Sequence, residues 1–115
     1  MLIDFEKVRI FVRPGVTDLR KQSSGLSIIV SEELALDPFS GSLFLFCNQR
    51  RTILKIVYWD LNGFCLWMKK LEKQKFPWPK DEKAAREITV EQLKWLLAGI
   101  DFWSPHRKLS YSQVS

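Results

Sequence analysis

The stretch from Tyr58 to Pro79 reads Tyr-Trp-Asp-Leu-Asn-Gly-Phe-Cys-Leu-Trp-Met-Lys-Lys-Leu-Glu-Lys-Gln-Lys-Phe-Pro-Trp-Pro. Its Asn62-Gly63 pair lies between two strand-like runs and is a strong short-range sign of a β-hairpin, because both residues tolerate positive φ. A type I turn starting at Asp60 and closed by a bulge at Gly63 would serve equally well. A two-residue turn at Asn62-Gly63 would place Tyr58 opposite Trp67.

Alternating or doubly apolar runs predict the remaining strands. The expected strands cover residues 8–13, 42–48, 53–59 and 64–71, with a short extended piece at residues 75–78. Short connections favour hairpins between consecutive strands, so we expect an antiparallel meander. Leu43-Phe44-Leu45-Phe46 is apolar on both faces, and such a sheet needs cover on both sides.

Two helices are predicted. Thr17 or Asp18 can cap the first, which extends toward Leu34 and carries Gly25, a sign of close packing or of a break. In the second, Thr89 and Gln92 form a capping box, and Gly99 lies where a C-terminal cap belongs. We therefore expect an α+β fold, with an antiparallel sheet meander of four to five strands packed with two helices. It would form a single domain over residues 1–103, followed by a loose tail at residues 104–115.

Composition is that of an ordinary water-soluble domain. The 115 residues are 46% apolar and 27% charged, and no apolar run approaches the roughly 20 residues that span a bilayer. The first residues contain acids where a signal peptide requires a basic stretch. We expect a cytoplasmic protein without membrane contact, in which Cys47 and Cys65 stay reduced and mostly buried.

The residue inventory argues against catalysis. His106 is the only histidine, which leaves neither a metal cluster nor a nucleophile with its base. The chain has no phosphate-binding glycine loop, and its aspartates fall mostly at expected turns and helix starts. We predict that the protein is not an enzyme and has no cofactor or metal.

Basic residues gather at one end of the predicted sheet. Arg50 and Arg51 lie on a strand connection, and Lys69 and Lys70 end a later strand. With the formal net charge of +5, these residues can contact phosphates and give salt-sensitive affinity. The alternative is that they keep the ends of the sheet soluble and discourage edge pairing.

The five tryptophans are candidates for stacking on nucleic acid, for the core or for a partner interface. Trp78 lies between two prolines and is the one expected to be exposed. We predict a partner surface that includes Trp67, Phe76 and Trp78. Replacing Trp78 with alanine would then weaken association and leave thermal stability almost unchanged.

Segments in order along almost the whole chain resemble a known family. They are Val8-Arg9-Ile10, Thr17-Asp18-Leu19-Arg20-Lys21, Gly25-Leu26, Asp37-Pro38-Phe39-Ser40-Gly41, Phe44-Leu45-Phe46-Cys47-Asn48, Arg50-Arg51, Lys55, Tyr58-Trp59-Asp60, Asn62-Gly63-Phe64-Cys65-Leu66-Trp67, Lys70-Leu71-Glu72, Phe76-Pro77-Trp78-Pro79, Leu96-Leu97 and Gly99-Ile100-Asp101-Phe102. The chain is similar to the TnpB-type accessory protein, the product of the second reading frame of insertion sequences of the sixty-six family. It departs from that pattern at Gln22, where glycine is common, and at Gln49, where arginine is common.

The resemblance implies a non-catalytic accessory protein that assists DNA transposition, because a separate transposase carries the catalytic carboxylates. Two hypotheses follow. In the first, the protein binds DNA at the element ends. In the second, it is an adaptor for the transposase or another accessory protein of the element, without direct DNA binding, and it can also self-associate. The predicted DNA-binding residues are Arg9, Arg20, Lys21, Arg50, Arg51, Lys55, Lys69 and Lys70.

Overall fold

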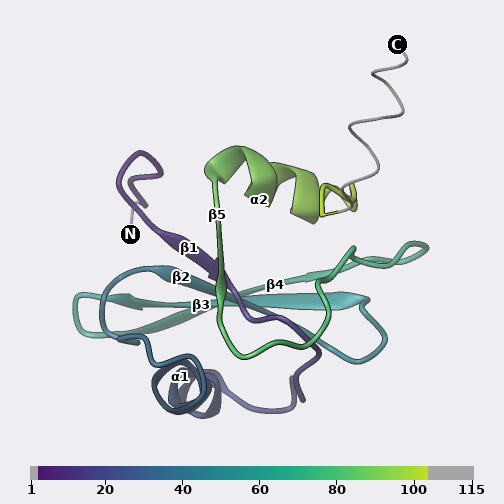
Figure 1. Cartoon of the computed structure of the whole chain (residues 1–115). Coiled ribbons are helices and arrows are strands. Elements are labelled where there is room, and N and C mark those ends of the chain that lie inside the picture. The colour runs from purple at the N-terminus through teal and green to yellow at the C-terminus, as the bar shows by residue number, and fades with distance from the viewer. Residues whose placement is uncertain (1–2, 104–115) are drawn as a thin grey trace.

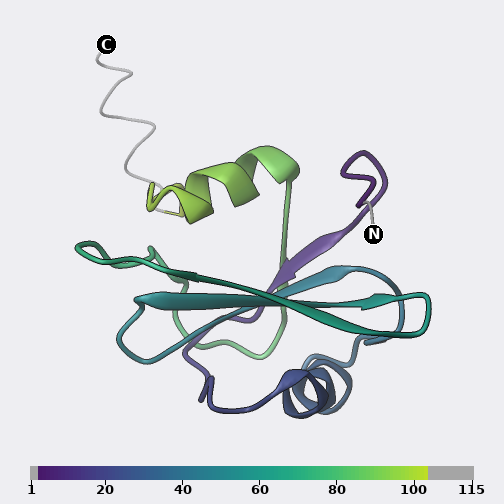
Figure 2. The ribbon, with the colours of Figure 1, turned by 180° about the vertical axis from the view of Figure 1, so that it is seen from behind.

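The computed structural model describes residues 3–103, which form one five-stranded sheet with a helix on each face (Figure 1). The elements in chain order are β1 (Ile10–Val12), α1 (Ser23–Glu32), β2 (Leu43–Cys47), β3 (Ile53–Asp60), β4 (Gly63–Lys70), β5 (Arg86–Ile88) and α2 (Val90–Leu97). The sheet order is β4-β3-β2-β1-β5. Seen from behind, α1 and α2 again lie on opposite sides of the sheet (Figure 2). The predicted tail at residues 104–115 lies outside the described residues.

The predicted α+β class and the antiparallel β2-β3-β4 meander are confirmed. The first strand differs from the expectation, because β1 pairs with β2 in parallel and with β5 antiparallel. A parallel pair needs a crossover, and the segment containing α1 provides it across one face. The charged segment before α2, for which no strand was predicted, supplies β5. None of the helices within residues 3–103 has the length and apolar character to cross a membrane.

The doubly apolar strands are covered on both faces, as predicted. The core on the α2 side includes Ile10, Val12, Leu43, Leu45, Cys47, Leu54, Ile56, Phe76, Trp78, Ile88, Leu93 and Leu96. The core on the α1 side includes Phe11, Leu26, Ile29, Val30, Phe44, Phe46 and Val57. Burial raises the pKa of the Cys47 thiol to about 12, as expected for a cysteine that serves as a small core residue.

The β3–β4 hairpin turns one residue earlier than predicted. Asp60 pairs with Gly63, so the two-residue loop is Leu61-Asn62 and Leu61 takes a φ of +52°. Trp67 consequently faces Ile56 rather than Tyr58. The shift is by two positions, and two is the side-chain period of a strand. Each β4 residue therefore keeps its predicted face and changes only its partner.

Helix α1 begins at Ser23, so the predicted cap at Thr17 or Asp18 is wrong. The Thr17 N–H donates to the Cys47 carbonyl at 2.8 Å, which holds this segment beside the end of β2. The Asp18 carboxylate accepts from Arg20, two residues further on. Both predicted caps are thus engaged in the loop that precedes the helix.

The capping box of α2 is confirmed. The Thr89 hydroxyl accepts from the Gln92 N–H at 3.1 Å, and the Gln92 side chain accepts from the Thr89 N–H at 2.9 Å. Gly99 follows the helix with a φ of +80°, the left-handed conformation typical of a helix end.

Replacing Thr89 with alanine removes the acceptor for an exposed helix-start N–H. We expect the free energy of unfolding to fall by about 1 kcal/mol in urea denaturation. Replacing Thr89 with serine keeps the hydroxyl and should recover most of that loss. Equal stability of the alanine and serine variants would contradict the role of the box.

Phe76 and Trp78, in the segment that follows β4, are buried, contrary to the predicted exposure of Trp78. Phe76 is 0% exposed and Trp78 is 8% exposed. The Trp78 indole N–H donates to the carbonyls of Arg13 and Gly15, both at 2.9 Å. Residues 75–78 form no strand; instead Phe76 and Trp78 pack in the α2-side core, and the Phe76 N–H donates to the Arg51 carbonyl at 2.6 Å.

Candidate nucleic-acid interface

The turn between β2 and β3 is shaped by Asn48. Its side-chain oxygen accepts from the N–H groups of Thr52 at 2.9 Å and Ile53 at 3.0 Å, and its carbonyl accepts from the Arg51 N–H at 3.0 Å. Arg51 takes a φ of +60° in this turn. The turn presents Arg50 and Arg51 as exposed side chains at one end of the sheet.

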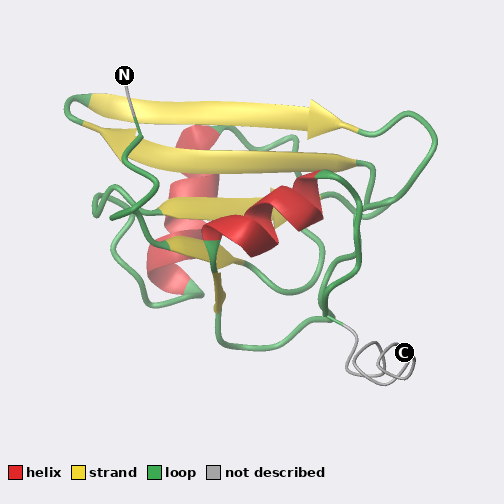
Figure 3. Cartoon of the chain, turned by 90° about the horizontal axis from the view of Figure 1, so that it is seen from above, coloured by secondary structure: helices red, strands yellow, loops and turns green. Residues whose placement is uncertain are grey.

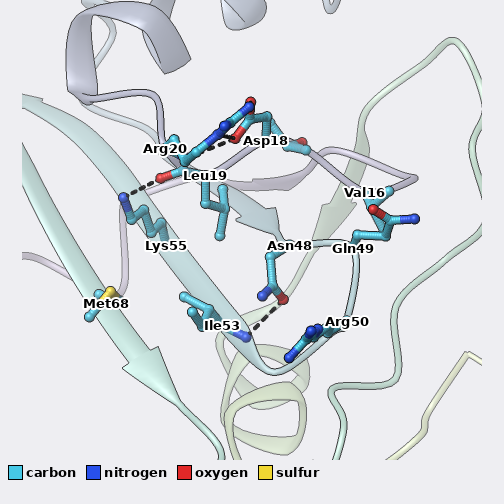
Figure 4. Close-up of a pocket in the computed structure, with 11 residues that line it drawn as sticks. Val16, Asp18, Leu19, Arg20, Asn48, Gln49, Arg50, Ile53, Lys55 and Met68 are labelled. Carbon is cyan, nitrogen blue, oxygen red and sulfur yellow. Dashed lines mark hydrogen bonds and ion pairs between the residues drawn. The ribbon is translucent and has the colours of Figure 1, made fainter.

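A groove of about 630 Å³ opens beside this turn on the α1 side of the sheet (Figure 4). We call it the basic groove. Its lining residues are Val16, Thr17, Asp18, Leu19, Arg20, Asn48, Gln49, Arg50, Ile53, Lys55 and Met68. Three of the predicted DNA-binding residues, Arg20, Arg50 and Lys55, come from separate segments and meet here. The parallel β1–β2 pair explains the meeting, since it brings residues 16–20 beside the end of β2.

The three basic side chains of the groove differ in the ion pairs and hydrogen bonds that they already form within the protein. Arg20 forms an ion pair with Asp18 at 2.7 Å, and the hydrogen bonds from Arg20 hold the pKa of the Asp18 carboxyl well below its usual range. Lys55 is half-buried and donates to the Leu19 carbonyl at 2.7 Å. Arg50 makes no ion pair or side-chain hydrogen bond with any residue of the described region. Arg50 is therefore the groove cation best able to bind an external anion.

Two predicted lysines lie near the groove. Lys70 is exposed and faces Ile53 across the β3–β4 ladder, which places it at the same end of the sheet as Arg50, as predicted. Lys21 is exposed just before α1. A Cβ at Gly25 would lie 3.1 Å from the Lys21 Cβ. The glycine at position 25 therefore leaves space for the Lys21 side chain. It does not mediate the close packing against a neighbouring element that the sequence suggested.

Three predicted residues lie elsewhere. Arg9 is at the opposite end of the sheet, where Glu87 binds it at 2.8 Å. Arg51 lines a different pocket, together with Trp78, on the α2 side. Lys69 also points to the α2 side and donates to the Leu97 carbonyl at 2.9 Å, at the end of α2.

Of the predicted partner surface, only Trp67 is exposed. Its side chain is 43% exposed, in the middle of β4. Phe76 and Trp78 are core residues, so the free protein does not present them to a partner. The proline neighbours that suggested exposure instead lead the chain into the core.

Metal chemistry was not expected from the sequence. Within residues 3–103, no group of three or more His, Cys, Asp or Glu side chains is arranged to hold a metal ion. His106 lies outside the described residues.

Comparison with known proteins identifies a family. The family model described as IS66 Orf2 like protein matches residues 8–107. The uncharacterized protein y4hO of Sinorhizobium fredii is 38% identical over 105 residues, which cover 91% of each chain. The uncharacterized protein y4jC of the same organism is 35% identical over 101 residues, covering 88% of this chain and 86% of y4jC. No solved structure matches. The chain belongs to the IS66 Orf2-like family of insertion-sequence accessory proteins.

Proposed function

We propose that this accessory protein assists transposition without catalysing it, by binding duplex DNA of the element through phosphate contacts at the basic groove. The observation that carries the proposal is the convergence of Arg20, Arg50 and Lys55 from three segments on one groove. Lys70 extends the basic surface at the same end of the sheet.

The state of each side chain indicates how such a contact would form. Arg50 can grip a phosphate with two parallel N–H groups, since nothing in the described region occupies its guanidinium. Lys55 retains two further ammonium donors beyond the one that binds the Leu19 carbonyl. Arg20 is partly neutralised by Asp18 and contributes less.

The groove favours the DNA backbone over base edges as the target. Its charged groups come from a turn, a loop and a strand rather than from a helix that could enter the major groove. Contacts to phosphate position a protein on DNA and carry little sequence information. We therefore infer weak binding with little sequence preference.

A salt titration of a short labelled duplex tests this proposal. With about four phosphates neutralised, log affinity should fall with log salt at a slope of about −3 to −4 between about 50 and 200 mM salt. Replacing Arg50 with alanine should flatten that slope by about one. A duplex of scrambled sequence should give the same slope as an element end.

The matched control is Arg51, its neighbour in the chain. Arg51→Ala removes the same charge, but this side chain lies on the α2 side and outside the groove, so the slope should stay at the wild-type value. Equal effects of the two variants would refute the groove as the site. Absence of any DNA binding at low salt would instead favour an adaptor that reaches the element only through the transposase.

A further inference from the structure

The two edges of the sheet are built differently. The β5 edge is three residues long, and ion pairs engage two of them: Glu87 binds Arg9 at 2.8 Å and Arg86 binds Glu82 at 3.0 Å. The β4 edge is eight residues long and forms one margin of the sheet, and no segment within residues 3–103 pairs with it (Figure 3). Proteins commonly protect an edge with charge, proline, a bulge or a short strand. The β5 edge has two of these devices.

The backbone N–H and C=O groups of successive β4 residues point alternately toward β3 and toward the open edge of the sheet. The Leu71 N–H donates to the Thr52 carbonyl at 2.8 Å, so in the register that continues from this pair the odd-numbered residues of β4 bond to β3. The backbone groups of the even-numbered residues then point outward. These are Phe64, Leu66, Met68 and Lys70. No hydrogen bond from the described residues reaches their backbone groups.

The side chains along this edge are apolar and exposed. Leu66, Trp67 and Met68 are 40%, 43% and 54% exposed, and the strand carries no charge before Lys69. Its eight-residue register with β3 runs without a bulge. Trp67 also lines an apolar pocket of about 270 Å³ on the α2 side, together with Phe5 and other residues. The free edge and the apolar surface are therefore continuous.

We infer that β4 pairs with β4 of a second copy of this chain, antiparallel across a two-fold axis, and so joins two sheets into one. Antiparallel pairing sets Lys69 and Lys70 of the two copies at opposite ends of the ladder, whereas parallel pairing would stack them beside each other. The two strands match in length because they are identical, and a contact of this kind is self-complementary and closed.

The outward backbone groups select the register. A hydrogen-bonded pair between the two copies requires, on each strand, a residue whose backbone groups point outward. The register centred on Trp67 pairs every such residue of one β4 with another in the second β4. In that register Leu66 faces Met68 of the second copy, and Lys70 faces Phe64. Trp67 of one chain faces Trp67 of the second chain at the two-fold axis, where an aromatic pair adds to stability. Registers centred on Leu66 or Met68 leave one outward-facing residue of β4 unpaired.

Sedimentation of the purified full chain over a range of concentrations tests the inference. Wild type should show a monomer–dimer equilibrium. Met68→Pro removes an outward N–H and spares the β3–β4 ladder, so it should raise the dissociation constant by about tenfold or more. Met68→Lys should act in the same direction without a backbone change. The control is Ile28→Lys, because Ile28 is also more than half exposed but lies on α1, and it should leave the constant unchanged.

A crosslink tests the register. In a Cys65→Ser background, Trp67→Cys places a thiol at the two-fold axis and should form a disulfide-linked dimer under mild oxidation, since facing strand positions lie within bonding reach. Trp95→Cys, at an exposed position on α2, should not. A monomer at every concentration overturns the inference, even if β4 pairs with a strand of another protein. A dimer that survives Met68→Pro and Met68→Lys and shows no Trp67→Cys crosslink also overturns it.

Discussion

Replacing Trp78 with alanine is expected to lower the free energy of unfolding by about 4 kcal/mol. The side chain is 8% exposed and packs in the α2-side core, so truncation leaves a large cavity. It also removes the N–H that binds the carbonyls of Arg13 and Gly15, which are then left with poorer partners. Domains of this size are stable by only about 5–15 kcal/mol, so the loss is a large share of the total.

Urea denaturation of wild type, Trp78→Ala and Trp78→Phe measures this effect. Phenylalanine keeps most of the packing and loses the indole N–H, so the cost should be about 1–2 kcal/mol. Dimerisation and DNA affinity of the phenylalanine variant should match wild type, because Trp78 belongs to neither proposed surface. A loss below about 1 kcal/mol for alanine would restore the exposed role that the flanking prolines suggested.

Reversing the charge of Arg50 is expected to lower DNA affinity by about 50-fold at about 0.1 M salt. Loss of one phosphate contact accounts for about eightfold at that salt, and repulsion between the new carboxylate and the DNA adds a comparable factor. The effect should shrink as salt rises, because screening weakens both contributions. Fluorescence anisotropy with Arg50→Glu gives the ratio directly.

Two further variants test whether the change in DNA affinity is specific to the basic groove. Arg51→Glu makes the same change of net charge on the α2 side and should cost only a few-fold through the overall field. Gln49→Arg adds a cation to the lining of the basic groove and should strengthen binding by about eightfold at about 0.1 M salt. A gain from Gln49→Arg together with a loss from Arg50→Glu would be difficult to explain by misfolding. No change in either variant would remove this turn from the site.

Local patterns predicted much of the fold and missed its long-range pairing. The strands of the meander and the box at Thr89 followed from apolar alternation and capping chemistry, which act over a few residues. The parallel β1–β2 pair did not, because alternation says which face a side chain takes and nothing about the partner strand. In β5, only Ile88 is buried, so three residues gave no periodic signal.

Only part of the candidate site could be predicted, because its remaining contacts depend on the same long-range pairing. The position of Arg50 and Lys70 at one end of the sheet followed from the hairpin connections. The neutralising partners were only partly accessible to sequence reasoning. Asp18 is two residues from Arg20 and could have been considered, whereas Glu87 reaches Arg9 across the β1–β5 pair. That contact joins residues 78 positions apart, and no local pattern reports it.

The position of β1 between β2 and β5 has a consequence for how the chain folds as it is synthesised. Hairpins form early because their closing loops are short, whereas distant pairings wait for the chain to supply the partner. β1 can pair with β2 once the middle of the chain has emerged, but its other edge stays open until Arg86–Ile88 follows. Hydrogen exchange during refolding should accordingly protect the amides of β3 and β4 before those that β1 and β5 share.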